Sequence, residues 1–440
     1  MRNRSLTAWS IAGCLLIATC ARADDLAAVV EQTLEYDSQI AQARANYEAS
    51  KQAVPIARAA LLPQISGGWG RAYNRIDVEE FPRQTYWQSG WMVNISQPIF
   101  DWTKWTAYQQ ADFVVAQGAV GLADARQAAM LRAIVAYFEA LSAEDELKRT
   151  NDYLAAIDAQ LDVIRRKRAA GETTVIDVQE AGVAREQAQL QRLNAEQDLA
   201  AKRRAVEQVS GRPFSRLAAL PPTAALPPLA GEGVDVWADQ ARSSGFTVQA
   251  KQLEWEIAKM ESKKVRAAHY PVVNVTGSYT PAGAASGYAR PTTTTTGMLS
   301  VMIPLFSGGE IQARLRQTLA LEDKAQEGMT TAMRDAEAAA RDDHARYARE
   351  RARSESLGRL VRSSRDTLSA TEIGYKVGSR TSLDVLRALD TLYSTQRDFM
   401  RSRYDAIVAL LKLKADAATL GSGDIAQVSS MLSQGADVAR

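Results

Sequence analysis

The stretch GYKVGSRTSLDVL, residues 374–386, interrupts a long region that otherwise has a helical pattern. The stretch KRAAGETTVIDVQ, residues 167–179, follows the same plan: a glycine, then a threonine and an aspartate at three-residue intervals, then a valine. Corresponding residues of the two stretches are 207 positions apart: Gly171 and Gly378, Thr174 and Thr381, Asp177 and Asp384. Two long helices that are broken at matching points by the same turn predict a duplicated helical hairpin.

Each of these turns has the residues of a helix end followed by those of a helix start. A glycine just past the last helical residue adopts the left-handed conformation that ends many helices. A threonine followed three residues later by an acidic residue is typical of a capping box at a helix N-terminus. From the residues alone, Asp177 and Asp384 are expected to finish helix N-termini, whether or not they have a further role.

Two proline-free windows surround the turns. No proline occurs from Ile99 to Arg212 or after Pro304, and both windows are rich in strong helix formers. Apolar residues in the first window follow the spacing of a coiled coil, as at Leu147, Leu154, Ile157, Leu161 and Ile164. The same spacing also fits the core of a helical bundle, so the windows predict long packed helices of either kind.

Other landmarks repeat at nearly the same distance along the chain. Pro63 precedes Pro271 by 208 residues, and Phe100 precedes Phe306 by 206, which a tandem duplication explains. Five prolines between 213 and 228 mark a linker. The first predicted repeat covers residues 24–211, with strands in 64–99 and a helical hairpin in 101–211. A linker and equatorial segment follows in 212–246. The second repeat covers 247–420, with strands in 271–304 and a hairpin in 309–420, and a flexible tail is expected in 421–440.

The lengths of the expected helices constrain the shape of the molecule. At 1.5 Å per residue, a helix over 101–170 spans roughly 105 Å, whereas the returning helix over 175–211 spans only about 55 Å. A helix over 36–62 adds about 40 Å, so two shorter helices stacked end to end can flank the long one. This arrangement predicts a rod with the strands at one end, the glycine turns at the other and the linker near the middle.

Short alternating stretches precede each long helix. In WQSGWMVNIS, residues 87–96, most large apolar residues share one face and most small or polar residues share the other. VVNVTGSYT, residues 272–280, alternates in the same way, and Leu299, Val301 and Ile303 form a third apolar face. Such alternation is typical of strands between lipid and water, and it also fits a half-buried strand of a soluble sheet.

The N-terminal residues 1–23 have the features of a secretory signal peptide. Two early arginines precede an apolar run and a small-x-small motif, and Asp24 follows directly. Cys20 offers an alternative lipidation site, although Thr19 fits that motif poorly. Because both cysteines, Cys14 and Cys20, lie in the signal, no disulfide, thiol nucleophile or cysteine-bound metal is expected in the mature chain.

The remaining composition gives no sign of catalysis. Removal of the signal takes away three arginines and leaves 50 Lys and Arg residues against 51 Asp and Glu residues, so the mature chain has no charge bias toward nucleic acid. The two histidines, His269 and His344, lie in different segments without a catalytic or metal-binding pattern around them. Glycine-rich phosphate loops are also absent from the sequence. We expect no catalytic residue, cofactor or metal site.

The strands carry the expectation about the membrane. No apolar run long enough for a membrane-spanning helix follows the signal. Four strands are too few to close a barrel, and lipid does not tolerate an open sheet edge. If the strands span a membrane, several chains must therefore share one barrel, and a secretory signal combined with such strands predicts a bacterial outer membrane.

Four motifs along the chain have a familiar form. They are LLPQ at 61–64, ISQPIFDWTKW at 95–105, IPLFSGGEIQAR at 303–314 and GYKVGSRTSLDVLRALDTLY at 374–393. They resemble the TolC family of outer-membrane efflux and type I secretion channels, and the resemblance covers roughly residues 25–420. The resemblance implies an α plus transmembrane β-barrel fold and a homotrimer in outer-membrane lipid. Each chain would give two strand pairs to a shared twelve-stranded barrel and two coiled-coil hairpins to a periplasmic tunnel. The resemblance also implies docking on a periplasmic adaptor and an inner-membrane transporter.

The resemblance implies a role for the turns in closing the tunnel. Tyr375 and Arg380 match residues that tie the second hairpin to the first at a closed periplasmic entrance. Asp177 matches the acidic partner of such a link. This chain departs from the family pattern at Ile176, where a hydroxyl residue would accept a hydrogen bond from the arginine, so one hydrogen bond of the entrance is in doubt.

Other turn residues match contact and pore positions of the family. Gly171, Val377 and Gly378 match the tips that contact the adaptor, and Asp384 matches a pore-facing acid at the constriction. Arg387 occupies the place of a second pore-lining acid. Three Arg387 side chains near three Asp384 side chains predict weaker cation selectivity and weaker block by polyvalent cations.

Two other classes of protein share some of these features. A periplasmic adaptor also carries a long coiled-coil hairpin, but usually one between two small β-rich halves, whereas two hairpins are expected here. A structural coiled coil without transport function has no obvious use for aromatic strands and duplicated glycine turns. The export channel is therefore the leading hypothesis, and its cargo, small molecules or proteins, is left open.

Overall fold

The computed structural model describes residues 25–77, 79–80, 82–214, 217–229, 233–281 and 293–437. The predicted signal peptide and Cys20 lie outside these ranges. The first repeat contains α1 (Leu26–Tyr36), α2 (Ser38–Lys51), α3 (Ala53–Ala59), β1 (Gln64–Ile76), β2 (Gln84–Phe100), α4 (Trp102–Ala169) and α5 (Val175–Ser210). The rest of the chain contains α6 (Val234–Ser244), α7 (Phe246–Ala267), β3 (Val272–Thr280), β4 (Thr294–Met302), α8 (Glu310–Lys376), α9 (Ser382–Asp416) and α10 (Ser422–Asp437).

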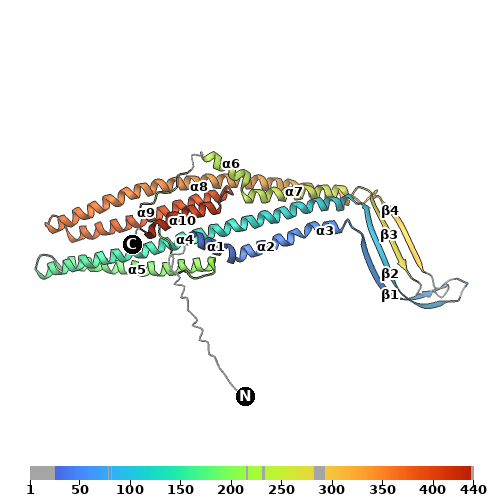
Figure 1. Cartoon of the computed structure of the whole chain (residues 1–440), viewed down its shortest axis with the longest axis horizontal. Helices are drawn as coiled ribbons and strands as arrows, with labels where there is room; N and C mark the ends of the chain where they lie inside the picture. Colours follow the sequence, from blue (N-terminus) through green and yellow to red (C-terminus); the bar gives the residue numbers. More distant parts are fainter. Residues whose placement is uncertain are drawn as a thin grey trace, which may run out of the picture.

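The helices form a long rod with the sheet at one end and both helix turns at the other (Figure 1). The two long helices, α4 and α8, have 68 and 67 residues. Along α4, α5 packs on the half nearer the turns and α1, α2 and α3 on the half nearer the sheet. Along α8, α9 and α7 occupy the corresponding halves. The predicted fold class, two long helical hairpins with strand pairs at the far end, is confirmed.

The helix expected over 36–62 is divided in the structure. The Asp37 carboxylate accepts a hydrogen bond of 2.7 Å from the Gln39 N–H and begins α2 there. A second break follows at Gln52, and Pro55 lies in the first turn of α3. Proline has no N–H to continue the helical ladder and its ring crowds the preceding turn, so a continuous helix through Pro55 is disfavoured.

The four strands form one antiparallel sheet in the order β1-β2-β3-β4. The pairing places Trp69 opposite Trp91 and Tyr73 opposite Trp87 on β1 and β2. Because side chains alternate between faces, the register gathers the large apolar residues of all four strands on one face. That face contains Ile65, Trp69, Tyr73, Trp87, Trp91, Val93, Ile95, Val273, Val275, Tyr279, Leu299 and Val301.

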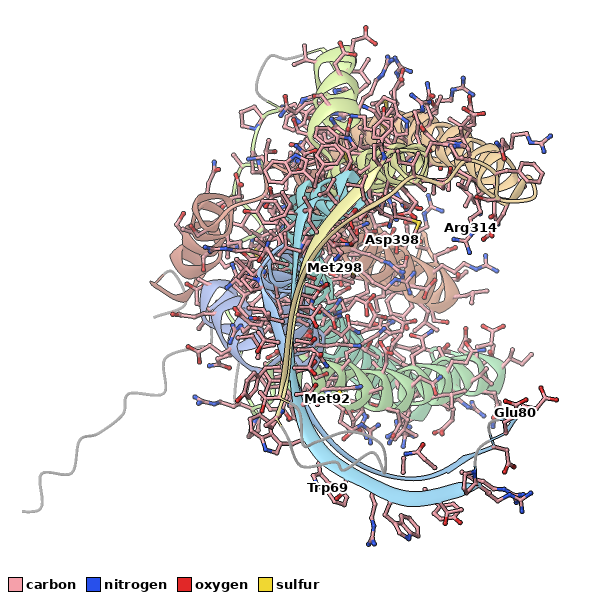
Figure 2. The ribbon with its side chains drawn as sticks, turned by 90° about the vertical axis from the view of Figure 1, so that its right-hand side faces the viewer. Trp69, Glu80, Met92, Met298, Arg314 and Asp398 are labelled. Carbon is pink, nitrogen blue, oxygen red and sulfur yellow. The ribbon has the colours of Figure 1, made fainter. Side chains whose placement is uncertain are left out.

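Within the described residues, no other part of the chain covers the apolar face of the sheet. Trp69 is 71% exposed and Leu299 is 67% exposed. Figure 2 shows a curved sheet with Trp69 on the outer side of the curve and Met92 and Met298 on the inner side. Apart from these methionines, the inner face has mostly small or polar residues, as expected where a lipid-facing surface backs a watery interior. Among the described residues, no helix combines the length and apolar character that crossing a membrane requires.

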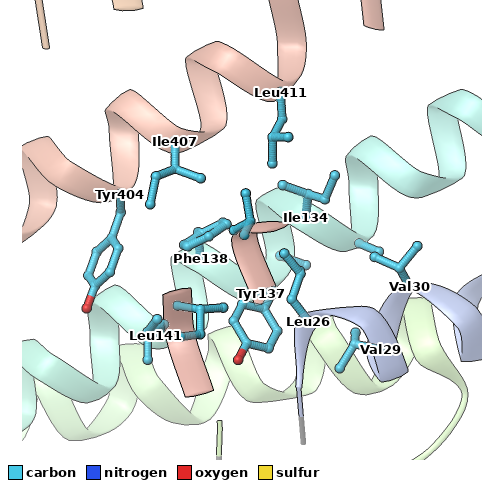
Figure 3. Close-up of a cluster of buried hydrophobic side chains, with 14 of the residues drawn as sticks. Leu26, Val29, Val30, Ile134, Tyr137, Phe138, Leu141, Tyr404, Ile407 and Leu411 are labelled. Atoms are coloured by element: carbon cyan, nitrogen blue, oxygen red, sulfur yellow. The ribbon is translucent and has the colours of Figure 1, made fainter. Parts of the chain in front are cut away.

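The largest core lies at the middle of the rod and joins the two repeats (Figure 3). Tyr137, Phe138 and Leu141 of α4 pack there against Tyr404 and Ile407 of α9 and against apolar residues of α1. A smaller core nearer the turns combines residues of both hairpins: Tyr153, Ile157, Leu161, Ile164, Ala181, Ala188, Val385, Leu386 and Leu389. This smaller core fixes α9 against α4 and so determines how the two turns face each other.

The linker between the repeats is fastened across the middle of the rod. The Tyr137 hydroxyl of α4 accepts a hydrogen bond of 3.0 Å from the Ala218 N–H. The Arg403 guanidinium of α9 is buried and donates to the carbonyl oxygens of Pro221 and Ala224. The Tyr347 hydroxyl of α8 donates to the Pro227 carbonyl. One extended segment thus holds helices of both hairpins, which stabilises the middle of the rod against separation of the repeats.

The prediction of a flexible tail in 421–440 is wrong for most of its length. Residues Ser422–Asp437 form α10, and Ile425, Val428 and Leu432 are buried in the central core. These residues are spaced by three and four positions, so they form one apolar stripe on the helix. The glycines and serines around this stripe obscured it in the composition.

Gly211 ends α5 and turns the chain into the linker. Its φ is +72°, and a Cβ there would overlap the ring of Tyr36. We expect Gly211→Ala to destabilise the protein by about 1–3 kcal/mol, because the left-handed backbone and the ring both oppose a side chain. Thermal unfolding, followed by the helical circular dichroism signal in detergent, measures the effect.

Gly182→Ala is the matched control because Gly182 lies inside the same helix, with open space around it. Alanine is the better helix former, so we expect this variant to be more stable by about 0.5–1 kcal/mol. Equal melting temperatures for the two variants would contradict the account of how α5 ends.

Candidate functional site at the helix turns

Both turns have the backbone geometry that the glycine spacing predicts. Gly171 has a φ of +79° and Gly378 a φ of +80°, the left-handed conformation that glycine adopts without strain. In the first turn the Glu172 N–H donates to the Lys167 carbonyl at 2.9 Å. In the second turn the Ser379 N–H donates to the Gly374 carbonyl, also at 2.9 Å. Each hairpin therefore ends in the same tight turn, which brings its two helices side by side.

Both returning helices begin with a complete capping box. In α5, the Thr174 hydroxyl accepts from the Asp177 N–H at 3.2 Å, and the Asp177 carboxylate accepts from the Thr174 N–H at 3.0 Å. Thr381 and Asp384 of α9 make the same two bonds at the same distances. The expected caps are confirmed, and they give both carboxylates a fixed orientation beside the turns.

The two capping aspartates differ in what else they bind. The Asp177 carboxylate also accepts a hydrogen bond of 2.6 Å from the Thr173 hydroxyl and one of 2.7 Å from the Ser382 hydroxyl of the other hairpin. These donors, with Thr174, hold the pKa of Asp177 far below its ordinary value. The pKa of Asp384 is lowered mainly by hydrogen bonds from Thr381. Asp177 therefore joins the hairpins as an anion, whereas Asp384 bonds within its own hairpin.

Tyr375 lies between the hairpins but does not use its hydroxyl there. The Lys167 ammonium of the first hairpin sits 4.2 Å from the centroid of the Tyr375 ring, a cation–π contact across the hairpins. The Tyr375 hydroxyl is buried and has no hydrogen-bond partner among the described residues. Burial, followed by the nearby charges of Asp177 and Glu172, raises the pKa of Tyr375.

The two arginines singled out in the sequence lie exposed beside the turns. The Arg380 N–H donates to the Gly374 carbonyl at 3.2 Å and helps to close the turn. Within the described part of the chain, neither Arg380 nor Arg387 makes a guanidinium hydrogen bond or ion pair. Both lie close enough to Asp384 to lower its pKa slightly, after the larger effect of Thr381. Arg380 is therefore not bound to Asp177 within one chain.

Four apolar side chains are exposed at the turns, among exposed charged residues such as Lys376. Ile176 and Val377 are 68% and 74% exposed, and Val175 and Ile373 are also exposed. Exposed apolar side chains at the end of a rod are costly unless a partner covers them. Both hairpins contribute to this group of exposed apolar side chains.

Sequence reasoning missed Ser382 and Lys167, which make contacts between the hairpins beside the turns. The duplication contains a signal for Ser382: 207 residues earlier, the corresponding position is Val175. A buried serine where the other repeat has an exposed valine marks a polar contact made by one repeat only. Lys167 lies in a run of four basic residues and has no such distinguishing signal.

Comparison with known proteins is consistent along nearly the whole chain. The family described as "Outer membrane efflux protein" matches residues 29–212 and again 237–418, one match for each repeat. Outer membrane protein TolC of Vibrio cholerae is 27% identical over 424 residues, covering 93% of this chain and 94% of that protein. The proteases secretion protein PrtF of Dickeya chrysanthemi is 26% identical, covering 91% of this chain and 89% of that protein.

Solved structures share the fold at lower identity. CusC superposes with a TM-score of 0.79 at 15% identity, covering 90% of this chain and 92% of that chain. The Campylobacter jejuni outer membrane channel CmeC has a TM-score of 0.79 at 14% identity, covering 99% of this chain and 98% of that chain.

The relatives are efflux and secretion channels, so the adaptor and structural coiled-coil alternatives give way to the export channel. The protein is an outer-membrane channel-tunnel for export. With both repeats matched, the chain belongs to the outer membrane efflux protein family.

Proposed function

We propose that three copies of this chain share one closed sheet in the outer membrane and one helical tunnel in the periplasm. The observation that carries this proposal is the open four-stranded sheet. Among the described strands, β1 and β4 each have a neighbour on one side only, and the face that no described residue covers is rich in aromatic residues. Lipid offers no hydrogen-bond partners to the backbone N–H and C=O groups at a sheet edge, so β1 of one chain would pair with β4 of the next. Three chains give twelve strands, enough to enclose a channel.

The turn end is the entrance in this proposal. Three-fold symmetry would bring six hairpin tips together around one axis, far from the sheet. The tips, including Gly171, Val377 and Gly378, would dock on a periplasmic adaptor that connects to an inner-membrane transporter. The names of two relatives refer to protease secretion and that of a third to efflux, so the cargo is a small molecule or a secreted protein.

Asp177, Tyr375 and Arg380 form the gate of this entrance in our proposal. Asp177 and Tyr375 lie at the contact between the hairpins of one chain. Arg380 is exposed and has no side-chain hydrogen bond or ion pair among the described residues, so its guanidinium is free to reach the first hairpin of the neighbouring chain. Asp384 and Arg387 would line the constriction next to it.

Replacement of Arg380 tests the gate. We expect Arg380→Ala to raise the open probability in planar bilayers on the order of tenfold, because loss of a charged hydrogen bond costs about 1.5–3 kcal/mol of the closed state. Arg362→Ala, which removes an exposed arginine farther from the turn on α8, is the matched control. If wild type and both variants conduct in the same way, the gate lies elsewhere.

Replacement of Arg387 tests the charge of the constriction. Arg387→Asp replaces a positive charge by a negative one, so in a trimer the total charge near the three Asp384 carboxylates falls by six units. A trivalent cation should therefore bind there much more strongly. We expect the variant to be blocked from the periplasmic side at concentrations on the order of tenfold lower than wild type. Arg362→Asp provides the same change of charge away from the constriction. Equal block of wild type and Arg387→Asp would show that Arg387 does not face the pore.

A further inference from the structure

One hydrogen bond nearest the turns joins the two hairpins of the chain. The Ser382 hydroxyl donates to Asp177 Oδ1 at 2.7 Å, across 205 residues of sequence. Ser382 is the first residue of α9 and is only 3% exposed, so water has little access to its hydroxyl. The bond therefore links the starts of α5 and α9, the two helices that return from the turns.

Asp177 is well prepared to accept this bond. Its other oxygen, Oδ2, is occupied by the Thr173 hydroxyl and by the N–H and hydroxyl of Thr174, all in the first hairpin. Oδ1 is left to face the second hairpin. A hydrogen bond from a hydroxyl to a carboxylate is stronger than one to a neutral oxygen. Because the Asp177 carboxylate is already held in place, it loses little conformational freedom when it accepts this bond.

The second contact between the hairpins at this level is the Lys167 ammonium on the Tyr375 ring. The tyrosine hydroxyl is not involved, since it has no partner among the described residues. A link from Tyr375 to Asp177 is expected from the family pattern, and here Ser382 takes the place of that hydroxyl. Because the first repeat has Val175 at the corresponding position, the serine is specific to one side of the contact.

We propose that Ser382 is a gating residue of this channel: its bond to Asp177, supported by Lys167 on Tyr375, holds the two hairpins of each chain together in the closed state. The inference rests on the proposed function, in which the turn end is the regulated entrance. Opening the entrance would require α9 to move away from α5, which breaks this bond once in each chain.

The test compares Ser382→Ala with Ser379→Ala in the full-length protein. Both changes remove one serine hydroxyl from the same turn region, but the hydrogen bond of the Ser379 hydroxyl among the described residues goes to the Gly374 carbonyl of its own hairpin. Single-channel recording in planar bilayers measures open probability. We expect Ser382→Ala to raise it on the order of tenfold, and Ser379→Ala to change it less than twofold. Lys167→Gln, which removes the cation from the Tyr375 ring, should give a smaller rise.

Amide hydrogen exchange separates failure of this inference from failure of the proposed function. If Ser382 joins the hairpins, Ser382→Ala should speed exchange in the first turns of both α5 and α9, whereas Ser379→Ala should affect the second hairpin alone. Faster exchange in both hairpins together with higher open probability supports the proposal. If faster exchange in Ser382→Ala is confined to α9, Ser382 does not join the hairpins, whatever the open probability. Faster exchange in both hairpins with unchanged conductance overturns the gating role of Ser382. If Arg380→Ala also leaves conductance unchanged, the proposed entrance at the turns fails as well.

Discussion

A β-sheet with open edges cannot lie in lipid alone, because every unpaired N–H and C=O on those edges lacks a hydrogen-bond partner. This chain has such a sheet, with β1 and β4 at its edges and an uncovered aromatic face. In the proposed assembly, association with other copies meets that constraint. The rod holds both helix turns at the far end from the sheet, so a symmetric closure of the sheet also gathers the turns around one axis (Figure 1).

Along the rod, stability and movement belong to different parts. The middle is held by the largest core and by the linker, which Tyr137, Arg403 and Tyr347 fasten to three helices of the two hairpins. The turn end has a smaller core and a few polar contacts between the hairpins. Movement of the hairpins therefore costs least at the turns, where an entrance is useful.

Much of this could be predicted from sequence, because it depends on short-range chemistry. The turn glycines, the capping boxes and the alternation of the strands are local patterns, and the duplication supplied their arrangement. The contacts of Ser382 and Lys167 could not be predicted in this way, since they depend on how two hairpins 207 residues apart pack together. The helix α10 was missed because its apolar stripe of Ile425, Val428 and Leu432 is hidden among small residues, and its partners lie in distant segments such as α1. Duplication also concealed a difference, because Asp177 and Asp384 have the same cap but only Asp177 reaches the other hairpin.

If several chains close one sheet, the mass of the assembled protein is a multiple of the mass of one chain. Native mass spectrometry of the mature protein, released from detergent micelles, counts the chains in each particle without a functional assay. We expect a particle of three chains that persists on dilution, since each chain depends on its neighbours for the edges of β1 and β4. A stable, fully folded particle of a single chain would contradict it, because one chain would then have to satisfy both edges of its sheet by itself.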